Sequence, residues 1–534
     1  MTRATIFTLF FSILLILMLP MSAASQAGGL GDQFFHQNSP GIEDFAEEQD
    51  RFGSAVATGD FNGDGYLDVA IGAYWDSVDG ASKAGLVHVF YGNTQGRLSA
   101  SDSEVWTQNS AGVADAAEVD DLFGYSLAVG DFDNSGHDDL AVGVPGESVG
   151  FAYGAGGVHV FYGADGGLGA GTNLLFTQDT LAMSDSSEWV DQFGFSLAVG
   201  NFDGDLFDDL AIGVSQESAE SGTTIFATGA VHVVYGSGFG GLNPILHEEY
   251  WTQATTGVPG TDGESDQFGD ALAAGDFDND GYDDLAVGAS GDDDGGAFRA
   301  GAVTILTGSI AGLGTLGPIL FQNDVSDDPV ESSDQFGSAL ATGYFNNDPY
   351  EDLVITASEW DLDGYQEAGI VHVVYGSSAG LQTGPGTPNQ TVTRDVLENF
   401  DEFGRASASG DINGDGYDDL ALGATGAEVN GQNGAGLVHV LLGGEDGLDL
   451  VNRQLLNQNL SGSEDPAEPS DLFGDALAIG HLNGDQCADI VVGVRGESIV
   501  PGQTNNGAVQ VFYSGLFGDD FESGTTSAWS FVTP

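Results

Sequence analysis

The sequence is poor in positive charge and almost without cysteine. Its 534 residues include 9 Lys and Arg against 82 Asp and Glu, a formal net charge of −73. A surface of that sign repels phosphate backbones and anionic lipid, so we expect no nucleic-acid partner and a preference for cations or basic partners. Cys487 is the single cysteine, which excludes an internal disulfide. The fold must therefore depend on a large core, on bound metal, or on both.

Long apolar runs are missing after the N-terminus. The one such run, from Ile6 to Leu19, follows Arg3 and precedes an Ala-rich stretch. It is shorter than the roughly 20 residues of a membrane-spanning helix, and its three parts are typical of a secretory signal peptide. We predict a signal peptide over residues 1–24, no transmembrane segment in the mature chain, and a secreted protein, extracellular or at the cell surface.

Helical periodicity is also missing, and a long repeat takes its place. A Phe-Gly pair recurs seven times, at Phe52, Phe123, Phe193, Phe268, Phe336, Phe403 and Phe473. Each unit contains four short strand-like segments separated by turn residues. Seven units of four strands predict an all-β fold, a seven-bladed β-propeller over residues 28–514.

The two ends of the repeat array are offset by one strand. Residues 34–38 (Phe-Phe-His-Gln-Asn) match the fourth-strand motif before any first strand has appeared, and the last unit stops at its third strand, near Val509. We predict that the N-terminal strand completes the last blade and closes the ring. An open solenoid, the alternative, does not need this offset.

Acidic loops between the first and second segments carry the main chemical signal. Oxygen-bearing side chains occupy loop positions 1, 3, 5 and 9, with Gly at position 6, which suits Ca²⁺. The four regular loops contain Asp60, Asn62, Asp64 and Asp68; Asp131, Asp133, Ser135 and Asp139; Asp276, Asp278, Asp280 and Asp284; and Asp411, Asn413, Asp415 and Asp419. An EF-hand requires Glu at position 12, where the first loop has Ile71. The alternative, plain Asp/Gly turns, does not require four loops in register.

Three loops depart from the pattern. The third begins with Asn201 and has Leu206 at position 6, but keeps Asp203, Asp205 and Asp209. The fifth begins with Tyr344 and the seventh with His481. We predict about four or five Ca²⁺ sites: the four regular loops, the third loop as the fifth candidate, and no ion in the fifth and seventh.

These motifs resemble FG-GAP repeats. The Phe-Gly pair, the acidic loop and segments such as 70–73 (Ala-Ile-Gly-Ala) together are similar to the propeller of integrin α subunits. The resemblance implies that the first strand lines a central channel, that the metal loops lie on the lower face, and that ligands bind the upper face. The 70-residue step from the second unit to the third leaves no room for an inserted domain, so we expect a bacterial, integrin-like protein. Residues 515–534 are either a sorting or attachment signature or a disordered end.

Adhesion or recognition of an extracellular protein or glycan is the predicted function. Candidate ligand residues in the variable loops are Tyr74, Trp75, Tyr153, Arg299, Trp360 and Tyr365. A hydrolase or lyase is one alternative, but no catalytic triad or nucleophile elbow can be assigned, so we predict no enzyme. A structural component of a matrix or surface layer is the other. Five strand histidines, from His88 to His439, share one strand position and are predicted to make a repeated structural hydrogen bond.

Overall fold

A computed structural model describes residues 32–514, except residues 43, 219–226, 262, 294–296, 316, 326–329, 363, 385–386, 461–464 and 501 and the side chains of 170–172. The predicted signal peptide (1–24) and tail (515–534) lie outside these residues. Across the described part of the chain, no helix is long and apolar enough to cross a membrane.

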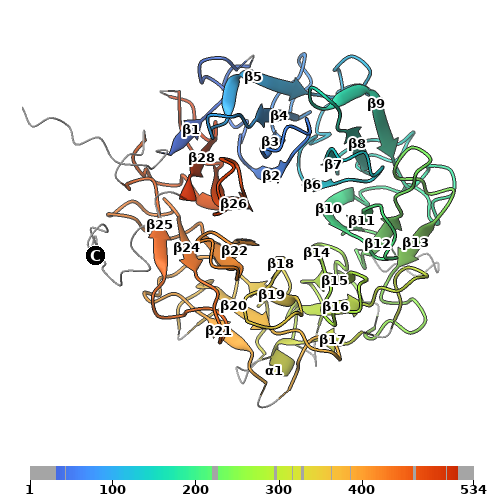
Figure 1. The fold of residues 1–534 in the computed structure, drawn as a ribbon, viewed down its shortest axis with the longest axis vertical. Coiled ribbons are helices and arrows are strands. Elements are labelled where there is room, and N and C mark those ends of the chain that lie inside the picture. The colour runs from blue at the N-terminus through green and yellow to red at the C-terminus, as the bar shows by residue number, and fades with distance from the viewer. Residues whose placement is uncertain are drawn as a thin grey trace, which may run out of the picture.

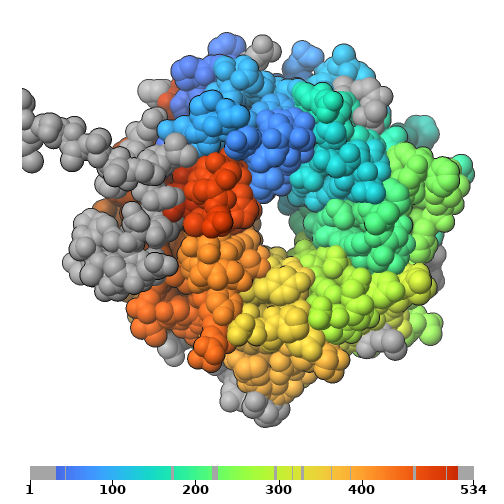
Figure 2. Space-filling model, in the orientation of Figure 1, coloured from blue at the N-terminus to red at the C-terminus, as the bar shows by residue number. Residues whose placement is uncertain are grey.

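Seven four-stranded antiparallel sheets surround a central channel (Figure 1). The space-filling view shows the opening at the centre of the ring (Figure 2). This confirms the predicted all-β, seven-bladed propeller. In each blade the first strand lies toward the channel and the fourth at the rim, as the family resemblance implied.

The first four blades follow the chain without interruption. Their strands are β2 (Ala55–Gly59), β3 (Asp68–Ala73), β4 (Leu86–Tyr91) and β5 (Ser99–Trp106); β6 (Leu127–Gly130), β7 (Asp139–Val144), β8 (Gly157–Tyr162) and β9 (Gly169–Phe176); β10 (Phe193–Gly200), β11 (Asp209–Val214), β12 (Ala230–Val234) and β13 (Glu248–Trp251); and β14 (Leu272–Gly275), β15 (Asp284–Ala289), β16 (Ala302–Leu306) and β17 (Ile319–Leu320).

The remaining blades include one short helix. Their elements are α1 (Gln322–Val325), β18 (Leu340–Gly343), β19 (Asp352–Ala357), β20 (Ile370–Val374) and β21 (Gln390–Val392); β22 (Phe403–Gly410), β23 (Asp419–Ala424), β24 (Leu437–Leu441) and β25 (Gln454–Leu456); and β26 (Phe473–Gly480), β27 (Asp489–Val494) and β28 (Ala508–Phe512), with β1 (Gln33–Phe35).

Strand β1 completes the seventh blade, as predicted. It pairs antiparallel with β28, in the register Gln33↔Val511 and Phe35↔Val509, so the sheet order is β1-β28-β27-β26 (Figure 1). Phe35 is buried and its ring centroid lies 4.9 Å from that of Phe90 in the first blade. The two ends of the array are therefore joined by both backbone pairing and core packing.

Burial follows the order of the strands within a blade. All six residues of β3 and of β4 are buried, whereas β2 beside the channel is mostly half-buried. The Phe of every Phe-Gly pair is fully buried between blades. The Gly of the pair needs a positive φ: at Gly124 φ is +85° and an added Cβ would lie 2.8 Å from the Leu86 carbonyl oxygen. Only glycine fits there without displacing the neighbouring strand.

The strand histidines make a different recurring contact from the one predicted. Their rings pack against the Phe of the Phe-Gly pair, with centroids 5.2 Å apart for Phe52 and His88 and 5.1 Å for Phe403 and His439. Their polar partners vary from blade to blade: His232 Nδ1 lies 2.7 Å from Glu248, but His159 Nδ1 lies 3.2 Å from an asparagine oxygen. The repeated interaction is therefore aromatic packing.

Candidate metal loops and upper-face pocket

Each sheet is antiparallel, so the loops leave the ring at two ends. Loops from strand 1 to strand 2 lie at one end, which we call the lower face. Loops from strand 2 to strand 3, and the connections between blades, lie at the opposite end, the upper face. The predicted metal loops are therefore all on the lower face, and the predicted ligand residues are on the upper face or buried beneath it.

The four regular loops share one fold, set by the aspartate at position 1. In the first loop Asp60 Oδ1 accepts the Asp64 N–H at 3.0 Å and Oδ2 accepts the Gly65 N–H at 2.9 Å. The same two bonds recur at Asp131, Asp276 and Asp411. The side chains at positions 3 and 5 also accept N–H groups two residues onward, so every loop oxygen is held at the same end of the turn. This arrangement confines the side-chain oxygens that could bind a metal ion to a small volume.

The aspartate at position 9 has a structural role in addition to its predicted one. It is buried in all seven blades, and in six of them its Oδ1 accepts the N–H of the glycine after strand 3, at 2.8 Å from Asp68 to Gly92. In most blades Oδ2 accepts an N–H at position 2, here Phe61 at 3.0 Å. This explains why Asp352 and Asp489 persist in the two loops predicted to be empty.

A ring of acids at position 8 was missed by the sequence reasoning. Asp138 Oδ2 accepts the Asp60 N–H of the preceding blade at 2.7 Å, and Asp208 accepts the Asp131 N–H at 2.9 Å. Asp283, Glu351 and Asp418 make the equivalent bond. The signal was an acid directly before the position 9 aspartate. These bonds fix the first residue of five loops to the next blade; the sixth and seventh loops lack the bond because Ala488 and Leu67 occupy position 8 of the blades that follow them.

The donor set of the regular loops fits a hard cation such as Ca²⁺. Carboxylate oxygens of Asp131, Asp133 and Asp139 lie within 4.8 Å of one another, as do those of Asp276, Asp278 and Asp280. Burial, together with the neighbouring carboxylates, raises the pKa of Asp139 to about 8. Crowded carboxylate oxygens are the ligands that Ca²⁺ uses in proteins. Asp68, Asp284 and Asp419 are the corresponding buried position 9 groups of the other regular loops.

The irregular loops differ from one another. In the third, Asn201 Nδ2 donates to the Asp205 carbonyl at 3.0 Å, and its buried Oδ1 accepts no hydrogen bond from any described residue, which suits a cation beside Asp203. In the seventh, Asn483 Nδ2 donates to Asp489 Oδ1 at 3.2 Å. That amide takes the place a cation would have beside the position 9 carboxylate.

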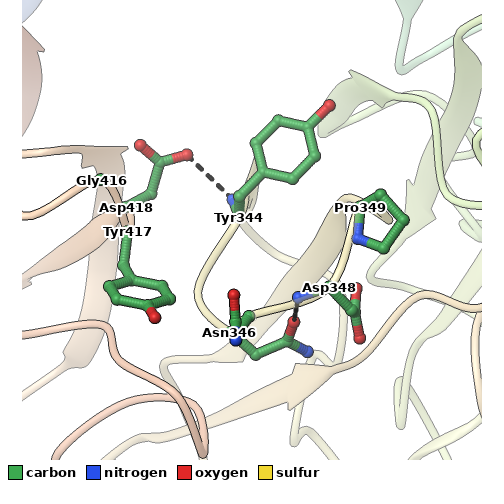
Figure 3. A pocket seen from close by; sticks show the side chains of 8 residues that line it. Tyr344, Asn346, Asp348, Pro349, Gly416, Tyr417 and Asp418 are labelled. Atoms are coloured by element: carbon green, nitrogen blue, oxygen red, sulfur yellow. Dashed lines mark hydrogen bonds between the residues drawn. The ribbon is translucent and has the colours of Figure 1, made fainter.

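The fifth loop lacks the first ligand. The side chain of Tyr344 points away from Asn346 and Asp348 (Figure 3), so position 1 offers them no oxygen. Its backbone N–H still donates to Asp418 of the next blade at 2.9 Å. Pro349 occupies the glycine position, and the loop lines a cavity of about 370 Å³ with the sixth loop. The interblade bond is thus kept although the ligand set is not.

A second cavity, of about 390 Å³, lies at the upper mouth of the central channel. Tyr74, Tyr125 and Phe195 form a continuous row of rings, with both neighbouring centroid pairs 5.1 Å apart. Three arginines line the same cavity, together with two acids: Arg299, Arg405, Arg495, Asp270 and Asp475. Arg495 Nε lies 3.1 Å from Asp475, whereas Arg405 is exposed to the cavity. The mouth is a positive spot on a strongly negative protein.

The predicted ligand residues separate into three groups. Tyr74 and Arg299 line this cavity, and Trp75 stands beside it under Arg51, whose Cζ lies 3.3 Å from the indole centroid. Tyr153 and Tyr365 are exposed but belong to loops outside the cavity. Trp360 is only 3% exposed and packs in the core, so its selection as a ligand residue was wrong. Its position, three residues after a buried strand, turns the side chain inward.

Sequence comparison agrees with this architecture. The FG-GAP repeat family matches six segments of the chain, residues 52–90, 123–161, 193–234, 268–306, 403–441 and 473–512. The chain is an FG-GAP repeat β-propeller. The unmatched unit is the fifth, whose blade is present but whose loop carries Tyr344 and Pro349.

The curated relatives are larger proteins. Phosphatidylinositol-glycan-specific phospholipase D of Rattus norvegicus is 34% identical over 30% of this chain and 18% of its own length. Integrin alpha-PS2 of Drosophila melanogaster is 30% identical over 45% of this chain and 15% of its own, and integrin alpha-5 of Xenopus laevis 29% over 46% and 22%. The chain thus spans less than a quarter of these relatives. A rhamnogalacturonan lyase of Bacillus licheniformis aligns over 86% of this chain and 71% of its own, at 13% identity and a TM-score of 0.39, too distant to bear on function.

Proposed function

We propose that this FG-GAP propeller is an exported, calcium-stabilised recognition protein that binds an anionic group of an extracellular protein or glycan at the upper channel mouth. The lower-face loops hold Ca²⁺ and stiffen the ring. The upper mouth supplies the binding surface. The integrin α relatives support a role in adhesion, although each of them extends far beyond the matched region.

One observation carries the proposal: the distribution of positive charge. The whole chain has 9 Lys and Arg, and three of these residues line one cavity. At the edge of this cavity, the Arg51 guanidinium donates a hydrogen bond to the Tyr74 hydroxyl. Guanidinium groups recognise carboxylates bidentately, and the row of aromatic rings offers an apolar surface beside them. A positive, aromatic-lined cavity on a protein of net charge −73 favours one anionic ligand at a defined place.

An enzymatic role has less support. The acids of the cavity are already engaged, Asp475 with Arg495 and Asp270 with the Ser290 hydroxyl. The strand histidines are buried against phenylalanine rings and do not reach the cavity. Catalysis by acid–base or nucleophilic groups requires such residues within reach of one substrate atom. The geometry therefore favours binding without chemistry.

The test is ligand binding by variants of one exposed arginine. Acidic oligosaccharides and acidic peptides are presented to the mature protein at fixed ionic strength and calcium. We expect R405A to weaken binding at least tenfold and R405K to weaken it less. R97A is the matched control, because it removes the same charge outside the cavity. Equal losses in R405A and R97A would show that binding depends only on net charge and would refute the site.

A further inference from the structure

A second set of acidic clusters lies on the upper face, at three junctions between blades. Each contains three carboxylates with oxygens within 4.8 Å of one another: Glu118, Asp121 and Glu147; Glu188, Asp191 and Glu217; and Glu468, Asp471 and Glu497. The first two acids of each set precede a Phe-Gly pair, and the third follows strand 2 of the same blade. None of these residues belongs to the metal loops of the lower face.

Every cluster has a buried glutamine from the preceding blade. Gln108, Gln178 and Gln458 donate Nε2 to the third acid at 2.5–2.6 Å, always across a separation of 39 residues. Each glutamine is only 1% exposed, and the Oε1 of the same amide has no hydrogen-bond partner among the residues that the structure describes. A buried acceptor without a donor is costly unless something electropositive faces it.

One aspartate in each of the first two clusters also has a carboxylate oxygen without a donor. Asp121 is fully buried; its Oδ2 accepts the Glu118 N–H at 2.5 Å, but its Oδ1 has no hydrogen-bond partner within the described ranges. Asp191 has the same arrangement. Burial, then the charge of the neighbouring acids, raises the pKa of Glu147 to about 8. In the first two clusters, acceptors from two blades thus converge, among them one carboxylate oxygen and one glutamine oxygen without a hydrogen-bond partner in the described part of the chain.

The junction between the fifth and sixth blades contains a natural comparison. There Arg394 occupies the glutamine position and forms an ion pair with Asp401, the equivalent of Asp121. Asp401 keeps the capping bond from the Glu398 N–H, at 2.8 Å. The third acid is replaced by Ala427, whose N–H bonds the Ala424 carbonyl in the same turn as at Glu147. Where one carboxylate is lost, the chain supplies a cation of its own.

The charges of the two arrangements agree. Glu398, Asp401 and the Arg394 guanidinium carry a net charge of −1. Three carboxylates and a divalent cation carry the same net charge. The junction between the fourth and fifth blades differs in another way: Trp360 fills the place of the third acid, and no described residue hydrogen-bonds the buried amide of Gln322.

We propose that the three upper-face clusters are Ca²⁺ sites, in which the carboxylates of one blade and the glutamine Oε1 of the preceding blade bind one ion that joins the two blades. The donors are hard oxygens, as Ca²⁺ prefers. Three carboxylates and an amide oxygen leave room for water in a coordination shell of six to eight ligands. A proton shared between acids is the competing explanation for the crowding, and it needs no metal.

Equilibrium dialysis against radioactive ⁴⁵Ca²⁺ distinguishes the two. We expect E147Q/E217Q/E497Q to bind three ions fewer than the wild type while D280N, on the lower face, loses one. Glutamine also mimics a protonated acid, so under the shared-proton explanation the triple variant keeps every ion. An unchanged count would overturn the proposal.

Exchanging the two kinds of junction provides an independent test. Q108R/E147A copies the arginine arrangement and should bind one ion fewer than the wild type. R394Q/A427E copies the acidic arrangement and should bind one more, which no loss of folding can imitate. Failure of the second exchange to gain an ion, in a variant that melts cooperatively, would contradict the assignment of the glutamine and third acid as ligands.

Discussion

One substitution pair isolates the energetic effect of calcium on the lower face. Asp280 and Asp348 occupy position 5 of the fourth and fifth loops, and each accepts a backbone N–H two residues onward at 3.1 Å. Asparagine preserves that bond in both loops. Asp280 shares a three-carboxylate cluster with Asp276, whereas the fifth loop begins with Tyr344. D280N and D348N therefore make the same local change, with and without a metal site.

The magnitude follows from binding to the folded state. Extracellular calcium modules have dissociation constants of about 10⁻⁴ to 10⁻³ M, so 10 mM Ca²⁺ adds about 1.4–2.7 kcal/mol for each site. Four regular loops together add about 6–11 kcal/mol. In a fold of this length one kcal/mol corresponds to about 1 °C in melting temperature. We expect a wild-type shift of at least about 6 °C, and a shift smaller by about 1.4–2.7 °C in D280N.

The assay is a thermal melt in 10 mM CaCl₂ and in EDTA at constant ionic strength. D348N should melt like the wild type in both buffers, and D280N should differ from it only in calcium. If D348N loses as much of the calcium shift as D280N, the loops are ordinary turns and the ions bind elsewhere. A wild type that does not respond to calcium would refute the lower-face sites altogether.

Three further predictions concern the ring and its core. F35A should lower the free energy of unfolding, measured in urea, by about 3–5 kcal/mol because it removes the ring that packs where β1 closes the propeller. F45A, which removes a ring that is 77% exposed, should change it little. Equal urea midpoints for the two variants would contradict closure by β1. Burial lowers the pKa of His372 to about 4, so its stabilising contribution is complete above pH 6.5 and falls by up to about 3 kcal/mol toward pH 4. H372Q should reduce this loss of stability at low pH. A pH profile of stability identical to that of the wild type would contradict the role of His372. G124A should destabilise more than G150A, since both glycines have positive φ but only the first meets a neighbouring backbone; equal midpoints would exclude the clash.

The repeat made most of the fold predictable. Because each unit places the same residue types at the same spacing, seven Phe-Gly pairs located the blades, and the offset at Phe34 located the closing strand. The position 1 aspartates were recognisable for the same reason. Periodicity within one unit is a local property that a single sequence displays directly.

Contacts between units were harder to predict. The bond from Asp138 to the Asp60 N–H, and that from Gln108 to Glu147, each join two blades, so no single unit contains both partners. The constant separation of 39 residues was the one available signal. Trp360 was misplaced because an aromatic residue in a variable loop was taken as exposed, although the turn after strand 2 directs that position into the core. Its equivalents, Glu147 among them, are buried too.

Both faces therefore solve the same mechanical problem. A ring with no disulfide must resist the separation of neighbouring blades, because the strand ladders run within each blade and the described backbone pairs between blades are isolated bridges such as Gly156 with Phe193. On the lower face, an acid of one blade fixes the N–H of a metal-loop aspartate in the blade before it. On the upper face, glutamine and acid meet across the junction. A cation in a lower-face loop would bind oxygens of one blade, at the residue whose N–H the next blade holds, whereas a cation in an upper-face cluster would bind oxygens of two blades. Both kinds of ion would offset the negative charge that alone would drive the blades apart.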